Sequence, residues 1–161
     1  WGYDDDTPEQ AAGKSLMERG LSVAVMEMCT GGALANNITD NPNSVSYFKG
    51  GNVAYDGAAL KSCGVPGEVM EKHGVVSQET ANAMAETVRR HLNADVGIAV
   101  TGVPGPGEFE GKPLGLAYIC VSNGEKIRGM EMRLPPRRVT IKRRVPNQAL
   151  IELRRLVEET D

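Results

Sequence analysis

The chain has 161 residues, of which 40% are apolar and 24% charged, a balance that predicts one globular domain and excludes a disordered chain. The net charge is −3 and no apolar run approaches the ~20 residues that span a bilayer, which argues against nucleic-acid-binding and membrane proteins. Three scattered cysteines and two histidines argue against a disulfide framework and a metal site, and we expect no cofactor.

Helix and strand signals alternate through the first half of the chain. The expected elements are a helix from Pro8 to about Arg19, a strand at 21–26, a helix near 33–38, and a short strand at 52–55 that follows Gly50-Gly51. The first helix has the clearest signal, because Thr7 can cap it, proline occupies its first position and Gln10 completes a capping box. Gly20 is expected to end this helix.

The second half adds a central strand and a hairpin. The expected elements are a short helix from Pro66 to Gly74, a longer helix after Ser77, strands at 96–101, 116–121 and 127–134, and a last helix from about Arg138. Asn123-Gly124 predicts the hairpin, and Pro146 is expected to kink the last helix or break it at Val145. Strands separated by helices and followed by a hairpin predict one domain over residues 1–161, a three-layer α/β/α sandwich with a mixed, mostly parallel sheet.

A Thr-Gly-Gly turn between the first strand and the next helix is the most informative local feature. It lies within Glu27-Met28-Cys29-Thr30-Gly31-Gly32. A helix N-terminus offers unpaired backbone N–H groups and partial positive charge, and the glycines let a ligand approach the backbone. We expect Glu27 to fix the turn by accepting backbone N–H bonds, and Thr30 to cap the helix and contact the ligand.

Several segments together carry a resemblance to a known family. They are the Thr-Gly-Gly turn, Tyr47-Phe48-Lys49-Gly50-Gly51-Asn52-Val53-Ala54-Tyr55, Lys72-His73-Gly74-Val75-Val76-Ser77, Thr101-Gly102-Val103-Pro104-Gly105-Pro106-Gly107 and Lys112-Pro113-Leu114-Gly115. In order and spacing, from about residue 10 to 157, the chain resembles the C-terminal domain of the CinA family, the nicotinamide mononucleotide amidases. The resemblance implies that a serine attacks a carboxamide, a lysine takes the serine proton, and backbone N–H groups stabilise the oxyanion.

The chain departs from the family pattern at both chemical positions. The family has Glu-Ser-Cys-Thr-Gly-Gly, and Met28, which has no ionisable proton, stands where the family has its serine. The family lysine lies five residues after the tyrosine matching Tyr55, but here that position is Leu60 and Lys61 follows it. One helical step rotates a side chain by about 100°, enough to miss a target. A shift in the preceding loop would compensate, so Lys61 stays a candidate as a cation in the pocket. These changes favour a pocket-bearing homologue with weak or lost amidase activity.

An active amidohydrolase is the alternative interpretation, acting on nicotinamide mononucleotide or a related carboxamide through Cys29 or a water molecule. A helix N-terminus lowers the pKa of a thiol, which favours Cys29 as a nucleophile. However, neighbouring residues at a strand end point in different directions, so Cys29 need not face the ligand as residue 28 does. A free cysteine also more commonly serves as a small buried side chain than as a nucleophile.

The candidate site gathers residues from several strand ends. The expected catalytic positions are Met28, Cys29, Tyr55 and Lys61, and the expected ligand-binding residues are Thr30, Gly31, Gly32, Gly102, Gly105 and Arg138. Ligands of open α/β sheets bind at the carboxyl ends of strands, so we expect the turn, Tyr55 and the 102–107 loop to line one cavity. Arg138 matches a family arginine placed for a phosphate, although Pro136-Arg137 replaces the family Gly-Asp before it. We expect His73 at a helix end or in the core.

The expected partner is a small, pyridine-nucleotide-like molecule. The basic residues at 137–144 have no aromatic residues among them, which disfavours nucleic acid. Relatives form homo-oligomers, and the Gly-rich segment 50–57 suggests an exposed sheet edge that a second copy can cover. The cysteine usage and the polar, acidic first residues, which lack a signal-peptide pattern, favour a cytoplasmic protein.

Overall fold

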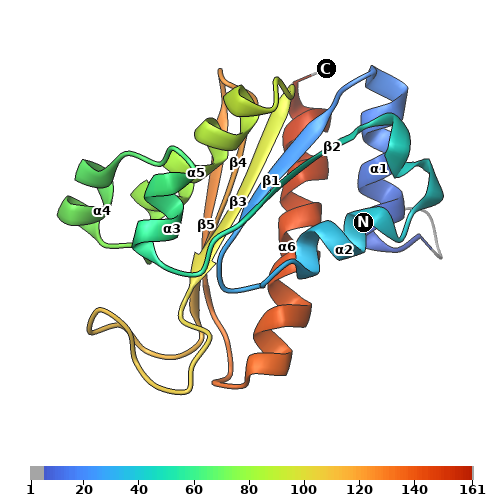
Figure 1. Ribbon diagram of the computed structural model, residues 1–161. Coiled ribbons are helices and arrows are strands. Elements are labelled where there is room, and N and C mark those ends of the chain that lie inside the picture. Colours follow the sequence, from blue (N-terminus) through green and yellow to red (C-terminus); the bar gives the residue numbers. More distant parts are fainter. Residues whose placement is uncertain (1–5, 161) are drawn as a thin grey trace.

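The computed structural model describes residues 6–160 and shows one five-stranded sheet between two layers of helices (Figure 1). The elements are α1 (Pro8–Arg19), β1 (Val23–Glu27), α2 (Ala33–Thr39), the 3-10 helix η1 (Pro42–Ser46), β2 (Phe48–Val53), α3 (Gly57–Ser62), α4 (Gly67–His73), α5 (Gln78–His91), β3 (Val96–Gly102), β4 (Leu116–Ser122), β5 (Ile127–Arg133) and α6 (Arg138–Glu159). Within residues 6–160, no helix is both long enough and apolar enough to cross a membrane.

The sheet is mixed and has the strand order β2-β1-β3-β4-β5. β1 is parallel to β2 and β3, and β4 is antiparallel to β3 and β5, so four of the five strands run in one direction. This confirms the expected fold class. Glu27 at the end of β1 lies opposite Val53 of β2 and Val100 of β3, so these three strands end at the same edge of the sheet.

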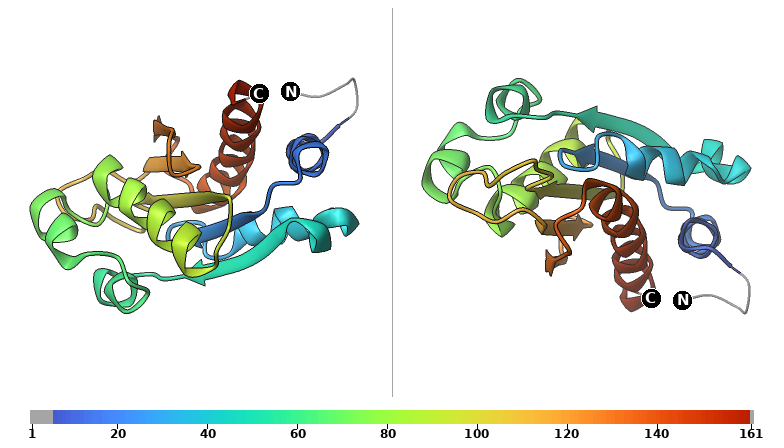
Figure 2. Two further views of the ribbon diagram at one scale, coloured as in Figure 1. Left: turned by 90° about the horizontal axis from the view of Figure 1, so that it is seen from above. Right: turned by 90° about the horizontal axis from the view of Figure 1, so that it is seen from below.

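The two faces of the sheet are covered by different helices (Figure 2). Helices α1, α2 and α6 pack on one face, and α3, α4 and α5 on the other. Side chains alternate along β1, so Val23 and Val25 belong to the first core and Ala24 and Met26 to the second. Burial of each valine or methionine side chain stabilises the fold by about 1.5–3 kcal/mol.

The local helix signals of the sequence are confirmed. The Thr7 side chain accepts from the Gln10 N–H, the Gln10 side chain accepts from the Thr7 N–H, and Gly20 ends α1 with φ 65°. The Ser77 side chain likewise accepts from the Thr80 N–H at the start of α5. These signals involve residues within one helical turn, so they do not depend on the rest of the fold.

Three local expectations are corrected. The second strand begins at Phe48 and contains Gly51, where a Cβ atom would lie 1.9 Å from the carbonyl oxygen of Val25, so only glycine fits. The sequence analysis assigned no helix to 57–62, where Asp56 caps α3. Pro146 does not break α6, which is helical from Arg138 to Glu159. The buried face of α6 on both sides of the proline offsets the ~3 kcal/mol that an interior proline costs.

Candidate functional site

A pocket of 280 Å³ opens at the shared carboxyl end of β1, β2 and β3. Its lining consists of Met28 after β1, Tyr55 after β2 and residues 103–109 after β3. β2 and β3 lie on opposite sides of β1, and α2 and α5 cover opposite faces, so this edge is the topological switch point at which α/β sheets bind ligands. A larger hollow of 520 Å³ between α1 and α6 contains none of the candidate site residues.

Met28 lies in the pocket as a nearly buried thioether, 3% exposed. Its backbone N–H donates to the Val100 carbonyl, which continues the β1–β3 pairing. Its Sδ lies 3.1 Å from Oγ1 of Thr101, and that hydroxyl also lies 2.9 Å from the Val75 carbonyl oxygen, the better acceptor for its one proton. A thioether has no proton to lose, so the Met28 side chain cannot act as a hydroxyl nucleophile does.

Cys29 lies on the other side of the sheet from Met28. It belongs to the core beneath α1, α2 and α6, is 1% exposed and does not line the pocket. Burial, together with the charge of Glu27, raises the pKa of its thiol to about 12. The thiol is therefore protonated near neutral pH and turned away from the pocket, and both facts argue against Cys29 as a nucleophile.

Glu27 fixes the turn from inside the core. Its carboxylate, which is completely buried, accepts the Thr30 hydroxyl at 2.5 Å and the N–H groups of Leu34 and Ala35 at 2.9 Å each. The expected structural role of Glu27 agrees with these bonds. The expectation that the start of α2 offers free N–H groups to a ligand is wrong for Leu34 and Ala35, because Glu27 already occupies them. Thr30 is also completely buried and presents no surface to a ligand.

The two glycines of the turn lie near α6 and β2 and do not line the pocket. A Cβ on Gly31 would lie 4.0 Å from the ammonium of Lys142, and one on Gly32 would lie 3.7 Å from the Val53 side chain. Gly31 has φ 59° and Gly32 has φ 103°, conformations that favour glycine. The shape of the turn therefore explains why both positions are glycine. Gly102 is buried at the end of β3, opposite Ala117.

Lys61 and Arg138 have different relations to the pocket. Lys61 is exposed in the last turn of α3, beside Gly67, and does not line the pocket. Arg138, in the first turn of α6, donates from Nη2 to the carbonyl oxygen of Gly105 at 2.7 Å, which places it at the pocket rim. Of the predicted site residues, Met28, Tyr55 and Gly105 line the pocket, Arg138 contacts its edge, and Cys29, Thr30, Gly31, Gly32, Lys61 and Gly102 do not line it.

Two residues beyond the expected 102–107 loop also line the pocket, and the sequence did not predict them. Glu108 and Phe109 line the pocket, and Phe109 is 39% exposed. The next residues fold back in a tight turn, in which Phe109 and Lys112 exchange two backbone hydrogen bonds. An aromatic residue between two carboxylates in a Gly-rich loop is the signal that could have indicated these positions. His73 lies at the end of α4, as expected.

A family model agrees with this arrangement of strand ends and loops. The model of the CinA C-terminal domain matches residues 5–157. The chain belongs to the CinA family. A putative competence-damage inducible protein of Desulforamulus reducens is 43% identical over 148 residues, which cover 91% of this chain and 36% of that protein. Across the first three curated relatives, the chain spans only 30–36% of their length.

Solved CinA structures share the fold. A CinA superfamily protein of Klebsiella pneumoniae superposes with a TM-score of 0.90 at 23% identity, covering 94% of this chain and 96% of that one. A CinA superfamily protein of Escherichia coli gives a TM-score of 0.87 at 27% identity, with 97% and 94% coverage. The CinA C-terminal fold therefore extends over nearly the whole chain.

Proposed function

We propose that this CinA domain binds a pyridine-nucleotide-like ligand in the pocket at the β1, β2 and β3 ends and has weak or no amidase activity. The observation that carries the proposal is Met28, which lies in that pocket where the family pattern has a serine. A domain that keeps the fold and the pocket but lacks the nucleophile can still bind.

The position that corresponds to the family lysine supports the same conclusion. Leu60, five residues after Tyr55, is completely buried and belongs to the same apolar cluster as Met28. Met28 and Leu60 thus replace a hydroxyl and a basic amine with two packed apolar side chains. Lys61 does not compensate, because its side chain is exposed and lies beside Gly67.

The pocket offers suitable groups for a flat ring that carries a phosphate. Tyr55 and Phe109 are 50% and 39% exposed and can stack against an aromatic ring. Arg138 uses one guanidinium N–H on Gly105, and the other donors of the guanidinium can bind a phosphate at the rim. These contacts need no nucleophile.

Ligand binding and ammonia release from nicotinamide mononucleotide test the proposal. We expect calorimetry to detect binding, and coupled ammonia detection to find very slow release or none. Robust release would contradict the proposal. If release survives Cys29→Ala, a water-based route is indicated; Glu108, the carboxylate in the pocket lining, is the candidate base, and Glu108→Gln should then abolish it.

A repair experiment tests whether Met28 and Leu60 occupy the positions of the family serine and lysine. Met28→Ser alone and Leu60→Lys alone should each raise ammonia release less than about tenfold. The double variant, which restores the family spacing from Tyr55, should exceed the product of the single effects, because nucleophile and base act as a unit. Circular dichroism must show that the variants with a buried lysine remain folded. Additive effects would contradict the assignment of Leu60 to the lysine position.

We also infer that the domain forms a homo-oligomer through the β2 edge of the sheet. β2 pairs on one side only, and Val53 on it is 55% exposed. Light scattering should give at least twice the monomer mass, and Val53→Lys should reduce it. Ile127→Lys is the matched control, because Ile127 is 53% exposed on β5, the strand at the opposite edge of the sheet. A monomer at high concentration would contradict the inference.

A further inference from the structure

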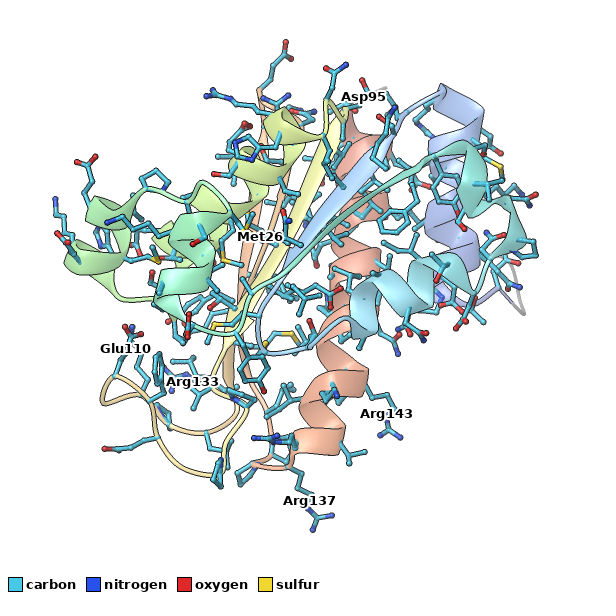
Figure 3. The ribbon with its side chains drawn as sticks, in the orientation of Figure 1. Met26, Asp95, Glu110, Arg133, Arg137 and Arg143 are labelled. Carbon is cyan, nitrogen blue, oxygen red and sulfur yellow. The ribbon has the colours of Figure 1, made fainter. Side chains whose placement is uncertain are left out.

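The loop that forms one side of the pocket is attached to the protein at two places outside the pocket. Residues 105–109 line the pocket after β3. On the α6 side, Arg138 donates to the Gly105 carbonyl at 2.7 Å. On the α4–α5 side, the turn Phe109–Lys112 contacts the segment 73–76 through two charged side chains, Glu110 and Lys112. Figure 3 shows Glu110 on the side of the loop toward α4, and Arg137 and Arg143 on the opposite side, at the start of α6.

Glu110 makes the more specific of these attachments. Its Oε2 accepts the Val75 N–H at 2.8 Å and its Oε1 accepts the Val76 N–H at 2.9 Å. We call this pair of bonds the Glu110 anchor. Lys112 reinforces it, because its ammonium donates to the carbonyls of Val76 and His73 and lies 3.7 Å from Glu110 Oε1. The side chain of Glu110 is 26% exposed, so these bonds are made at the protein surface.

The backbone at Glu110 is held in a conformation that a glutamate rarely adopts. Its φ is 55°, and Gly111 follows at 72°, the combination that a type I′ turn requires at its two central positions. Among residues 6–160, Asn93 is the one other non-glycine residue with a positive φ. A residue other than glycine or asparagine persists in this region when surrounding contacts over-determine it. The anchor supplies those contacts.

We propose that Glu110 is a positioning residue for the pocket: it holds the 105–109 side of the pocket against Met28 and Tyr55, although it does not line the pocket itself. Gly105 and Gly107 have no side chains to pack, and Pro104 and Pro106 have no backbone N–H to donate, so the segment has few internal contacts to hold its place. The affinity of the pocket therefore depends on bonds made behind it. This inference rests on the proposed ligand site.

Glu110→Gln is the decisive variant, because glutamine has the same shape but turns an NH2 group toward one of the two N–H donors. Glu110→Gly removes the carboxylate and also relieves the positive φ, so it keeps the turn favourable. Asn93→Gly is the matched control, since it relieves the other positive φ far from the anchor. Amide hydrogen exchange of residues 105–109 and calorimetry with nicotinamide mononucleotide are the two measurements.

Within this segment the Phe109 N–H donates to the Lys112 carbonyl. We expect its exchange to be about tenfold faster in both Glu110 variants, while exchange at Val25 and Ile98 in the sheet stays unchanged. The dissociation constant should rise about tenfold, and saturating ligand should restore protection of the loop in Glu110→Gln. Asn93→Gly should change neither quantity.

Two results would overturn the inference: unchanged loop exchange in both variants, or faster exchange with an unchanged dissociation constant. If the unaltered protein does not bind nicotinamide mononucleotide, the proposed function fails for this ligand. The exchange data then still decide whether Glu110 holds the loop.

Discussion

Glu27 and Glu110 make the same bonds in opposite surroundings. Each carboxylate accepts the backbone N–H groups of two consecutive residues, Leu34 and Ala35 for Glu27, and Val75 and Val76 for Glu110, all at 2.8–2.9 Å. Glu27 is completely buried, whereas the Glu110 side chain is 26% exposed at the protein surface. The first pair fixes a turn that the core depends on, and the second fixes a loop that the pocket depends on.

Loss of the Glu27 carboxylate and loss of the Glu110 carboxylate should change different properties of the protein. A buried N–H that loses its partner finds no water, so its desolvation is uncompensated and the whole fold is weakened. The Glu110 carboxylate is partly exposed, so water can take its place as the acceptor, and its loss is mainly a local loosening. Substitution at Glu27 should therefore change stability, and substitution at Glu110 should change the pocket.

Glu27→Gln should give the largest effect. One amide oxygen cannot replace two carboxylate oxygens that accept two N–H groups and the Thr30 hydroxyl, so a buried donor is left unpaired. We expect the free energy of unfolding in urea to fall by about 2–4 kcal/mol. Glu125→Gln, in the exposed β4–β5 turn, is the control and should change it by less than about 0.5 kcal/mol. If Glu27→Gln lowers the free energy of unfolding by less than about 1 kcal/mol, the Glu27 carboxylate matters no more to stability than the Glu110 carboxylate is expected to.

Thiol labelling tests whether the turn held by Glu27 is closed. Because burial raises the pKa of Cys29 to about 12, iodoacetamide at pH 8 should modify Cys29 at least ~100-fold more slowly than the partly exposed Cys63. The fraction of thiolate grows with pH below the pKa, so the Cys29 rate should still be rising at pH 10. Mass spectrometry of peptides reports each site, and urea should make the rates similar. Fast labelling of Cys29 in the native protein would show that the turn opens.

Glu110→Gln should give the smallest effect on stability. Water can replace the lost acceptor at this partly exposed site, so we expect the free energy of unfolding to fall by about 1 kcal/mol or less. The same urea titration used for Glu27→Gln measures it, so the two glutamines form a matched pair. A loss as large as that of Glu27→Gln would mean that the 105–109 loop belongs to the cooperative core.

Part of the site could be predicted from the sequence, since residues that directly follow strands must meet at one sheet edge. This reasoning brought Met28, Tyr55 and Gly105 to one pocket. It could not assign Cys29 and Thr30, because whether a residue at a strand end faces the pocket or the core depends on the last pairing of the strand. It also missed Glu108 and Phe109, since the path of a Gly- and Pro-rich loop has no periodic pattern.

The sequence by itself determined the family and the alternation of helices and strands, because both depend on residues that are adjacent or at fixed spacing. Only the tertiary structure decided that Cys29 is buried on the face opposite Met28, that Leu60 packs in the cluster of Met28, and that Glu110 reaches Val75 and Val76. These relations join residues 32–35 positions apart or opposite faces of one strand end. They follow from how the chain packs, which local spacing does not specify.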